Sequence, residues 1–308
     1  MPLWRGSSLM TQPTTRKYPW TYLPLEWFLM GLARLPLPVL HVLAGGLYGL
    51  MHYVIGYRKR VVLENLRNSF PEKSDAEIQQ IRKGFYRHFS QVMVEMLKLA
   101  AMSDAELRRR VVIRNPELLS GPFAQGRTVL ALGSHAGNWE WILPSGALEF
   151  PGRAYGVYKP LSNPFFEDFL FRLRTRSGAH LIPMRDTLRD LIKRRTEGRA
   201  MSMLTDQAAG PEDRPYWTQF LNQETSFYSS ADRLASQFNC PVVYVNIKRV
   251  KRGYYELVIL PLHDGNTPLD KDGYVVTEAF ARHLERDIQA APADYLWTHR
   301  RWKHKRVS

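Results

Sequence analysis

Short apolar runs alternate with amphipathic stretches along most of this chain. Apolar runs between turn residues are typical of buried strands, whereas apolar residues three or four apart are typical of helices that cover them. The strands predicted in this way are residues 128–132, 154–158, 200–204, 242–248 and 254–260. Their alternation with helices predicts an α/β fold, in which helices cover a mixed, mostly parallel sheet.

Several helices have starts that the sequence encodes. Ser74 and Glu77 form a capping box before an amphipathic helix, because each side chain can bond to the other residue's backbone N–H. Asn163 followed by Pro164 is typical of an N-cap with proline at the first helical position. Further helices are predicted near residues 186–197, 229–239 and 275–290.

A long uncharged segment lies near the N-terminus. Residues 35–57 contain no formally charged side chain when histidine is neutral, and a bilayer span needs about 20 such residues. The glycines, prolines and histidines within it leave three interpretations open: a true span, a re-entrant or interfacial anchor, and a pair of buried core helices. We predict a mobile basic N-terminus at 1–18, a hydrophobic, helical membrane anchor at 19–60 and a main domain at 61–308.

Charge and composition narrow the partners. Lysine and arginine number 43 against 29 acidic residues, and the net charge of +14 implies acidic partners such as nucleic acid, anionic lipid or an acidic protein. The basic residues are dispersed rather than gathered in a known recognition motif, so we expect no nucleic acid. A single cysteine, Cys240, excludes an intramolecular disulfide and a cysteine-rich metal site. Without a glycine-rich phosphate loop, neither a metal nor a nucleotide cofactor is expected.

The turn after the first predicted strand carries candidate chemistry. His135 lies in this turn and Glu140 follows five residues later, with Asn138 between them as the expected N-cap of the next helix. Five residues on a helix separate two side chains by about 140°, so His135 must precede the helix to meet Glu140. We expect Glu140 to accept one ring N–H of His135, which leaves the other ring nitrogen to take a proton.

Three polar residues follow predicted strands at their carboxyl ends. They are His135, Lys159 and Asp206. Ligands of such sheets bind beyond the carboxyl ends of the strands, so we expect these side chains to share one site. Two other classes stay open at this point: a hydrolase that uses Ser134 as its nucleophile, and a basic membrane-binding or nucleic-acid-binding protein without catalysis.

Five motifs follow one another along the chain. They are Arg60-x4-Asn65-Leu66 with Phe70-Pro71, His135-x4-Glu140, Tyr158-Lys159-Pro160 with Asn163-Pro164, Asp206-Gln207 with Gly210-Pro211, and Tyr295-Leu296-Trp297-x-His299-Arg300-Arg301-Trp302-Lys303. With them the chain resembles the lipid A biosynthesis acyltransferases, the lauroyl and myristoyl transferases of the lysophospholipid acyltransferase superfamily. The resemblance runs from about residue 20 to the C-terminus.

This resemblance implies an enzyme that moves a fatty acyl chain from acyl carrier protein to a hydroxyl of a lipid A precursor. Coenzyme A is the alternative carrier, and a lysophospholipid, an aminolipid or a glycolipid is the alternative acceptor. His135 would be the general base, oriented by Glu140, with no metal or cofactor. Basic residues 58–60 directly after the uncharged segment place the acyltransferase domain, 61–308, on the cytoplasmic face of the inner membrane.

The resemblance also implies a set of substrate-binding residues. They are Lys159, Asn163, Arg174, Arg176, Asp206, Gln207, Arg300 and Arg301. The cationic members are expected to face lipid phosphates. Lys159 stands where an arginine is expected, so it keeps the charge but loses the planar fork. We expect the basic tail with Arg300 and Arg301 at the membrane-facing rim of the site, bound to anionic head groups or to the acidic carrier.

Overall fold

The sheet at the centre of the protein has the predicted class. The computed structural model describes residues 18–270 and 273–306, so residues 1–17 of the predicted mobile N-terminus lie outside the described residues. Seven strands of the described chain form one sheet in the order β1-β9-β8-β2-β5-β3-β4. Neighbouring strands are parallel except for the antiparallel pair β8–β9. The prediction of a mixed, mostly parallel sheet is confirmed.

All five predicted strands are present, and others join them. The bounds are β1 (Val111–Arg114), β2 (Thr128–Gly133), β3 (Ala154–Tyr158), β4 (His180–Pro183), β5 (Arg199–Leu204), β8 (Val242–Lys251) and β9 (Tyr254–His263), with β6 (Tyr216–Phe220) and β7 (Gln223–Phe227) as a separate hairpin. The edge strands β1 and β4 and the β6–β7 hairpin were not predicted. β1 and β4 have four residues each and the strands of the hairpin five, so each offers few positions from which a pattern could define a strand.

Helices surround this sheet. Their bounds are α1 (Leu23–Arg34), α2 (Leu37–Gly49), α3 (Lys59–Ser69), α4 (Asp75–Lys98), α5 (Asp104–Arg110), α6 (Glu117–Ala124), α7 (Ile142–Glu149), α8 (Pro164–Thr175), α9 (Thr187–Lys193), α10 (Ser230–Phe238) and α11 (Val275–Ala290). Two of the predicted caps are confirmed: Ser74 and Glu77 form the capping box of α4, and Asn163 accepts the first free N–H groups of α8.

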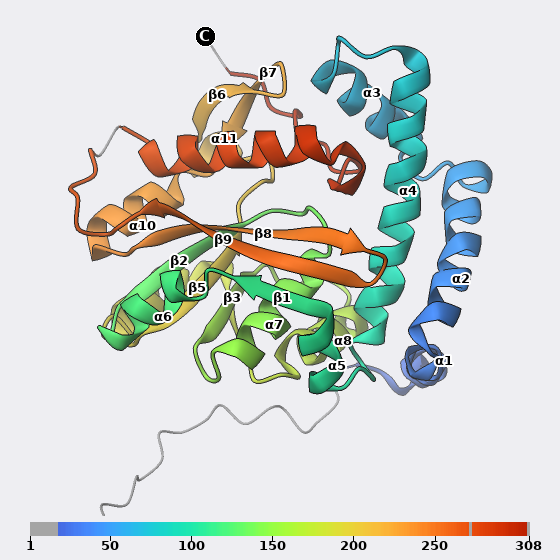
Figure 1. Cartoon of the computed structure of the whole chain (residues 1–308), viewed down its shortest axis with the longest axis horizontal. Helices are drawn as coiled ribbons and strands as arrows, with labels where there is room; N and C mark the ends of the chain where they lie inside the picture. Colours follow the sequence, from blue (N-terminus) through green and yellow to red (C-terminus); the bar gives the residue numbers. More distant parts are fainter. Residues whose placement is uncertain (1–17, 271–272, 307–308) are drawn as a thin grey trace, which may run out of the picture.

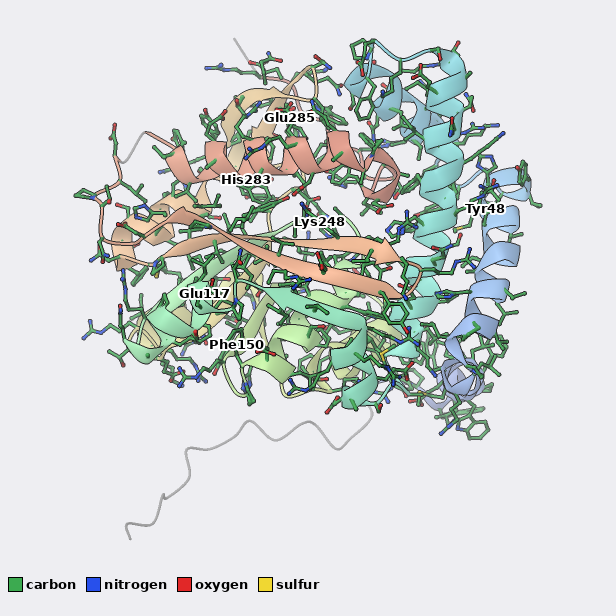
Figure 2. The ribbon with its side chains drawn as sticks, in the orientation of Figure 1. Tyr48, Glu117, Phe150, Lys248, His283 and Glu285 are labelled. Carbon is green, nitrogen blue, oxygen red and sulfur yellow. The ribbon has the colours of Figure 1, made fainter. Side chains whose placement is uncertain are left out.

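Strand β2 is buried on both faces, as its continuous apolar sequence predicts. Leu130 and Leu132 pack in the core cluster of α10 and α11, whereas Val129 and Ala131 pack in the cluster of α6, α7 and α8. The two layers lie on opposite sides of the sheet in Figure 1. Figure 2 shows β8, marked by Lys248, between the layer that holds His283 and the layer that holds Phe150.

Helices α1 and α2 lie on the side of α4 that faces away from the sheet (Figure 1). In the described part of the chain, one helical segment, Leu37–Val54, is long and apolar enough to cross a membrane, and only 28% of it is buried. Its outward side chains include Val42 and Val54, which are 75% and 76% exposed. This exposure argues against the interpretation of α2 as part of a buried core helix pair.

The inward face of α2 is attached to α4. Leu37, Leu40 and Ala44 form a small buried cluster with Val94 of α4. At the corner between α1 and α2, the Lys98 ammonium donates to the carbonyls of residues 33 and 35 over 3.1 and 3.0 Å. These contacts make α2 part of the packed structure on one side while its other side stays apolar and open.

Residues 294–302, which we name the C-terminal strap, cross the carboxyl ends of the central strands. The strap bonds to the turn after β2: the N–H of Leu296 donates to the carbonyl of His135 over 3.0 Å, and Ala136 bridges Tyr295. Asn65 of α3 fastens the strap from outside, since its amide donates to the carbonyls of Trp297 and His299, both over 2.9 Å.

The contacts of Asn65 predict a measurable loss of stability in Asn65→Ala. One buried and one partly buried carbonyl would lose their donor, and each lost bond costs about 1 kcal/mol, so the free energy of unfolding should fall by about 2 kcal/mol. Asn68→Ala is the matched control, because Asn68 lies one turn further along α3 and is exposed. Urea unfolding of both variants would check this, and equal losses would show that Asn65 does not fasten the strap.

Candidate active site

The register of two strands brings His135 and Asp206 together. β2 and β5 are parallel neighbours, and Gly133 pairs with Leu204 at their carboxyl ends. His135 and Asp206 each lie two residues beyond this pair. Strand β3 flanks β5 on its other side and ends just before Lys159. The expectation that residues after these strands gather at one edge of the sheet agrees with this arrangement.

The His135 imidazole is held by Asp206 at two points. The ring Nδ1 lies 2.8 Å from Oδ1 of Asp206, and the backbone N–H of His135 donates to Oδ2 over 3.1 Å. Because a carboxylate only accepts, Nδ1 carries the proton and Nε2 carries the lone pair. The side-chain amide of Gln207 lies 3.5 Å from Nε2 and can donate a long hydrogen bond to it. The histidine side chain is 17% exposed and that of Asp206 only 3%.

Charge stabilises the protonated ring despite its burial. Burial lowers the pKa of His135, but the charge and hydrogen bond of Asp206, with a further contribution from Glu140, outweigh it and raise the pKa above its usual value. Burial raises the pKa of Asp206, but the charge and hydrogen bonds of His135 outweigh this and hold the pKa of that carboxyl below its usual value. The pair therefore consists of an ionised carboxylate and a basic imidazole.

Glu140 does not make the hydrogen bond that the sequence analysis assigned to it. Its carboxylate is held by the guanidinium of Arg174 on α8, with Nε and Nη2 at 3.0 and 2.8 Å, and by the indole of Trp139 at 3.2 Å. The short 3₁₀ helix Trp139–Trp141 directs Glu140 toward α8. The predicted orienting role of Glu140 is thus taken by Asp206, and Glu140 acts on His135 through its charge.

Asn138 was expected to cap the helix after the turn, and this is wrong. It makes no side-chain cap bond. Its amide instead donates to Oε2 of Glu95, in the middle of α4, over 2.8 Å. Glu95 has no sequence signal of its own beyond a charged residue on an otherwise apolar helix face. The sequence analysis missed it, and a buried carboxylate of this kind is found only from the fold.

The other predicted binding residues have diverse surroundings. Lys159 is exposed at the end of β3. Asn163 caps α8 and also donates to the hydroxyl of Tyr22 over 3.2 Å. Arg176, at the end of α8, pairs with Asp104 of α5 at 3.4 Å. These contacts of Asn163 and Arg176 join elements of the fold, and both binding roles stay predictions. Asn163 also lines the apolar cavity described below.

The two arginines of the tail differ in their exposure, and the membrane-facing place of Arg300 stays a prediction. Arg300 is exposed. Arg301 is 2% exposed, its guanidinium lies 4.4 Å from the ring centroid of Phe227, and its nitrogens find no hydrogen-bond partner among the described residues. Its charge helps lower the pKa of Asp206. The expectation that Arg301 meets head groups at the surface is therefore wrong, because its guanidinium packs on aromatic rings in the interior and does not reach the surface.

His299 of the strap also faces this site. Its Nε2 accepts the backbone N–H of Ala208 over 3.3 Å, two residues beyond Asp206. Burial lowers the pKa of His299 to about 4, so its ring stays neutral and can accept this bond at neutral pH. The strap therefore closes over the residues that follow β5 as well as over the turn that follows β2.

An apolar cavity of about 420 Å³ lies between α1, α4 and α8. Its walls include Leu29, Met96 and Phe169, and its rim includes Leu161 in the loop that follows Lys159. Such a lining suits hydrocarbon rather than a polar ligand. Among residues 18–270 and 273–306, no cluster of histidine, cysteine and acidic side chains could hold a metal ion.

The site combines an unprotonated imidazole nitrogen with a buried carboxylate that orients the ring, and an apolar cavity lies in the same domain. These features suit an enzyme that transfers acyl groups to hydroxyls. Ser134 is buried, and the described bonds of the His135 ring go to Asp206 and Gln207 rather than to its hydroxyl. This arrangement favours direct transfer over a serine hydrolase. The fold and the site together define an acyltransferase.

Comparison with known proteins identifies the family. Residues 13–304 match the family of bacterial lipid A biosynthesis acyltransferases, and the chain belongs to it. It is 26% identical over 288 residues to the lipid A biosynthesis lauroyltransferase of Escherichia coli (strain K12), covering 92% of this chain and 90% of that one. It is 25% identical to the palmitoleoyltransferase of the same organism, covering 92% of each, and 22% identical to the myristoyltransferase, covering 78% and 73%.

The tight turn at Gly137 predicts a test of the site's scaffold. Gly137 has φ +58°, and an added Cβ would lie 1.9 Å from the carbonyl oxygen of Ile247. Gly137→Ala should therefore cost about 3 kcal/mol of stability and lower the acyltransferase activity, because the turn that carries His135 must shift.

Gly152→Ala separates clash from backbone strain. Gly152 also has positive φ, +74°, but nothing lies within 4 Å of the added Cβ. This control should cost only about 1 kcal/mol and leave activity intact. Thermal unfolding and initial rates of both variants are the measurements, and equal effects would show that β8 yields to the new methyl group.

Proposed function

We propose that this enzyme performs a secondary acylation, transferring a fatty acyl chain from acyl carrier protein to a hydroxyl of a lipid A precursor. The observation that carries the proposal is the His135–Asp206 pair, which leaves Nε2 of the ring unprotonated and able to take a proton. The relatives named above act in lipid A biosynthesis, which supports the same class of acceptor for this chain.

His135 acts as the general base of a direct transfer. Its Nε2 takes the proton of the acceptor hydroxyl as the oxygen attacks the thioester carbonyl. The carbon–sulfur bond of the tetrahedral intermediate then breaks, and the imidazolium returns the proton to the leaving thiolate. One ester is formed and one thiol released, so the proton is conserved and no covalent acyl-enzyme is needed.

Asp206 and Glu140 divide the electrostatic work. Asp206 fixes the tautomer by accepting from Nδ1 and stabilises the imidazolium that forms. Glu140 adds negative charge nearby and is itself held by the fork of Arg174. We assign Arg174 a positioning role for this reason. Lys159 and Arg300, which are exposed cations, are the proposed contacts for lipid phosphates.

The donor side rests on two features. The apolar cavity between α1, α4 and α8 offers a place for the acyl chain. The net charge of +14 favours an acidic carrier protein over a small cofactor, because electrostatic attraction speeds the encounter with an acidic surface. Coenzyme A stays the alternative donor, and another membrane lipid the alternative acceptor.

We place the enzyme on the cytoplasmic face of the inner membrane. Apolar side chains of α1 and α2 point outward, among them Trp27, Phe28 and Val42. The opposite side of α2 packs on α4. Since one face of the helix is occupied by protein, this packing favours an interfacial anchor over a lone bilayer span. Basic residues 58–60 at the end of the segment suit the anionic cytoplasmic leaflet.

The direct test is acyl transfer by the purified full chain in detergent micelles. Acyl carrier protein and coenzyme A thioesters of the same fatty acid are offered with a lipid A precursor or with a lysophospholipid, and the products are identified by mass spectrometry. We expect a product with lipid A precursor and carrier protein, and a loss of at least about a hundredfold in His135→Ala. Transfer only to the lysophospholipid, or full activity of His135→Ala, would refute the proposal.

The raised pKa of His135 predicts the pH dependence of the reaction. A general base must be neutral, so kcat/KM should rise with pH through a midpoint above the usual value of about 6.5. In Asp206→Asn the stabilising charge is lost while burial remains, so the pKa should fall and the rising limb should move to lower pH, with a lower plateau. Identical midpoints in the two pH–rate profiles would exclude His135 as the titrating base.

A further inference from the structure

Glu95 is a buried carboxylate outside the residues that the proposed mechanism uses. It lies in the middle of α4 and is fully enclosed, with 0% exposure. Burial of an unpaired carboxylate costs several kcal/mol, so such a group persists only when donors surround it. The donors that surround Glu95 therefore identify the elements of the fold that this carboxylate holds together.

Donors from three separate elements meet on this carboxylate. His41 of α2 lies with Nε2 2.8 Å from Oε1. Asn138 of the catalytic turn and Tyr255 of β9 both donate to Oε2, over 2.8 and 2.6 Å. Because carboxylate oxygens accept, His41 supplies the proton of its bond. One carboxylate thus joins the outer helix, the turn that carries His135, and the sheet.

The position of the catalytic turn depends on this carboxylate. Asn138 is completely buried and lies between His135 and Glu140 in the sequence. Its amide bonds to Glu95 instead of capping the next helix. The neighbouring Trp141 donates its indole N–H to the backbone carbonyl of Glu95 over 3.1 Å. A shift of the Glu95 carboxylate would therefore displace Asn138 and, with it, the turn that carries His135.

His41 is the donor that holds the Oε1 side of Glu95. Without it, a buried oxygen would lack this partner, and the carboxylate would turn toward its two remaining donors. That movement would be passed to Asn138, three residues from the base. Displacements of about 1 Å in a reacting group can lower turnover by up to about a hundredfold.

We propose that His41 is a positioning residue of the active site, through which helix α2 completes the catalytic geometry. The chain of contacts runs from His41 to Glu95 to Asn138 and so to the turn of His135. This inference rests on the proposed role of His135 as the base. With this role α2 is more than an anchor, because the helix with the open apolar face also supplies the hydrogen-bond donor that positions the catalytic turn.

The test compares three substitutions in α2 and in the π-helical turn that continues it. His41→Leu removes the donor, whereas His41→Gln keeps an N–H at a similar distance from the backbone. His52→Leu is the matched control: His52 is buried in the same helical run, but its ring packs on Tyr86 rather than bonding to Glu95. All variants are made in the full chain, with wild type and His135→Ala assayed in parallel.

We expect His41→Leu to lower kcat by about tenfold through displacement of the turn. The KM values for donor and lipid should stay within about twofold, since substrate contacts are unchanged. His41→Gln should regain most of the lost rate, and His52→Leu should keep wild-type kcat. A change in KM alone, a defect in His41→Gln as deep as in His41→Leu, or an equal loss in His52→Leu would overturn the inference.

Asn138→Ala keeps the proposal falsifiable if His41→Leu fails to fold. It breaks the same chain of contacts at the other end, leaves α2 intact and should also lower kcat with little change in KM. Wild-type kcat in Asn138→Ala refutes the inference. The two proposals fail in different ways: an active His135→Ala refutes the function of the base, whereas an inactive His135→Ala beside a fully active His41→Leu refutes only the role of His41.

Discussion

The parallel pairing of β2 with β5 is the constraint on which the active site depends. Their register aligns Gly133 with Leu204, and the residues two positions further on are His135 and Asp206. The backbone of His135 donates to the same carboxylate that binds its ring, so the pair is fixed in both position and orientation. Because β2 is buried along its whole length and β5 over most of it, the sheet can supply this geometry without help from a flexible loop.

Buried charge organises the rest of the site. Asp206, Glu140 and Glu95 are all largely enclosed. The turn that carries His135 supplies donors to Asp206 and to Glu95, whereas Arg174 of α8 donates to Glu140. Low surrounding polarity strengthens each of these contacts and makes each donor hard to remove. The turn from His135 to Glu140 bonds to Asp206 and to Glu95 and contains Glu140 itself. Hydrogen bonds of all three carboxylates therefore determine its shape.

The basic residues have more than one task. The large net charge alone suggests that the lysines and arginines lie at the surface and bind acidic partners. In the fold, Arg174 holds Glu140 and Arg301 lies enclosed near Asp206, so part of the positive charge balances carboxylates inside the domain. Lys159 and Arg300 are among the exposed cations of the described chain, and they are the ones that we propose to contact the substrate.

Local sequence patterns determined five of the strands, the caps of α4 and α8 and the place of the site, because periodicity, N-capping and the ends of apolar runs depend on neighbouring residues. They also placed His135 and Asp206 beyond strand ends. They could not decide which carboxylate His135 would meet, since that follows from the pairing of strands some 70 residues apart, as the bond between residues separated by 71 positions shows. The contact of Asn138 with Glu95 and the burial of Arg301 are likewise products of tertiary packing, because each depends on a partner that lies far away in the sequence.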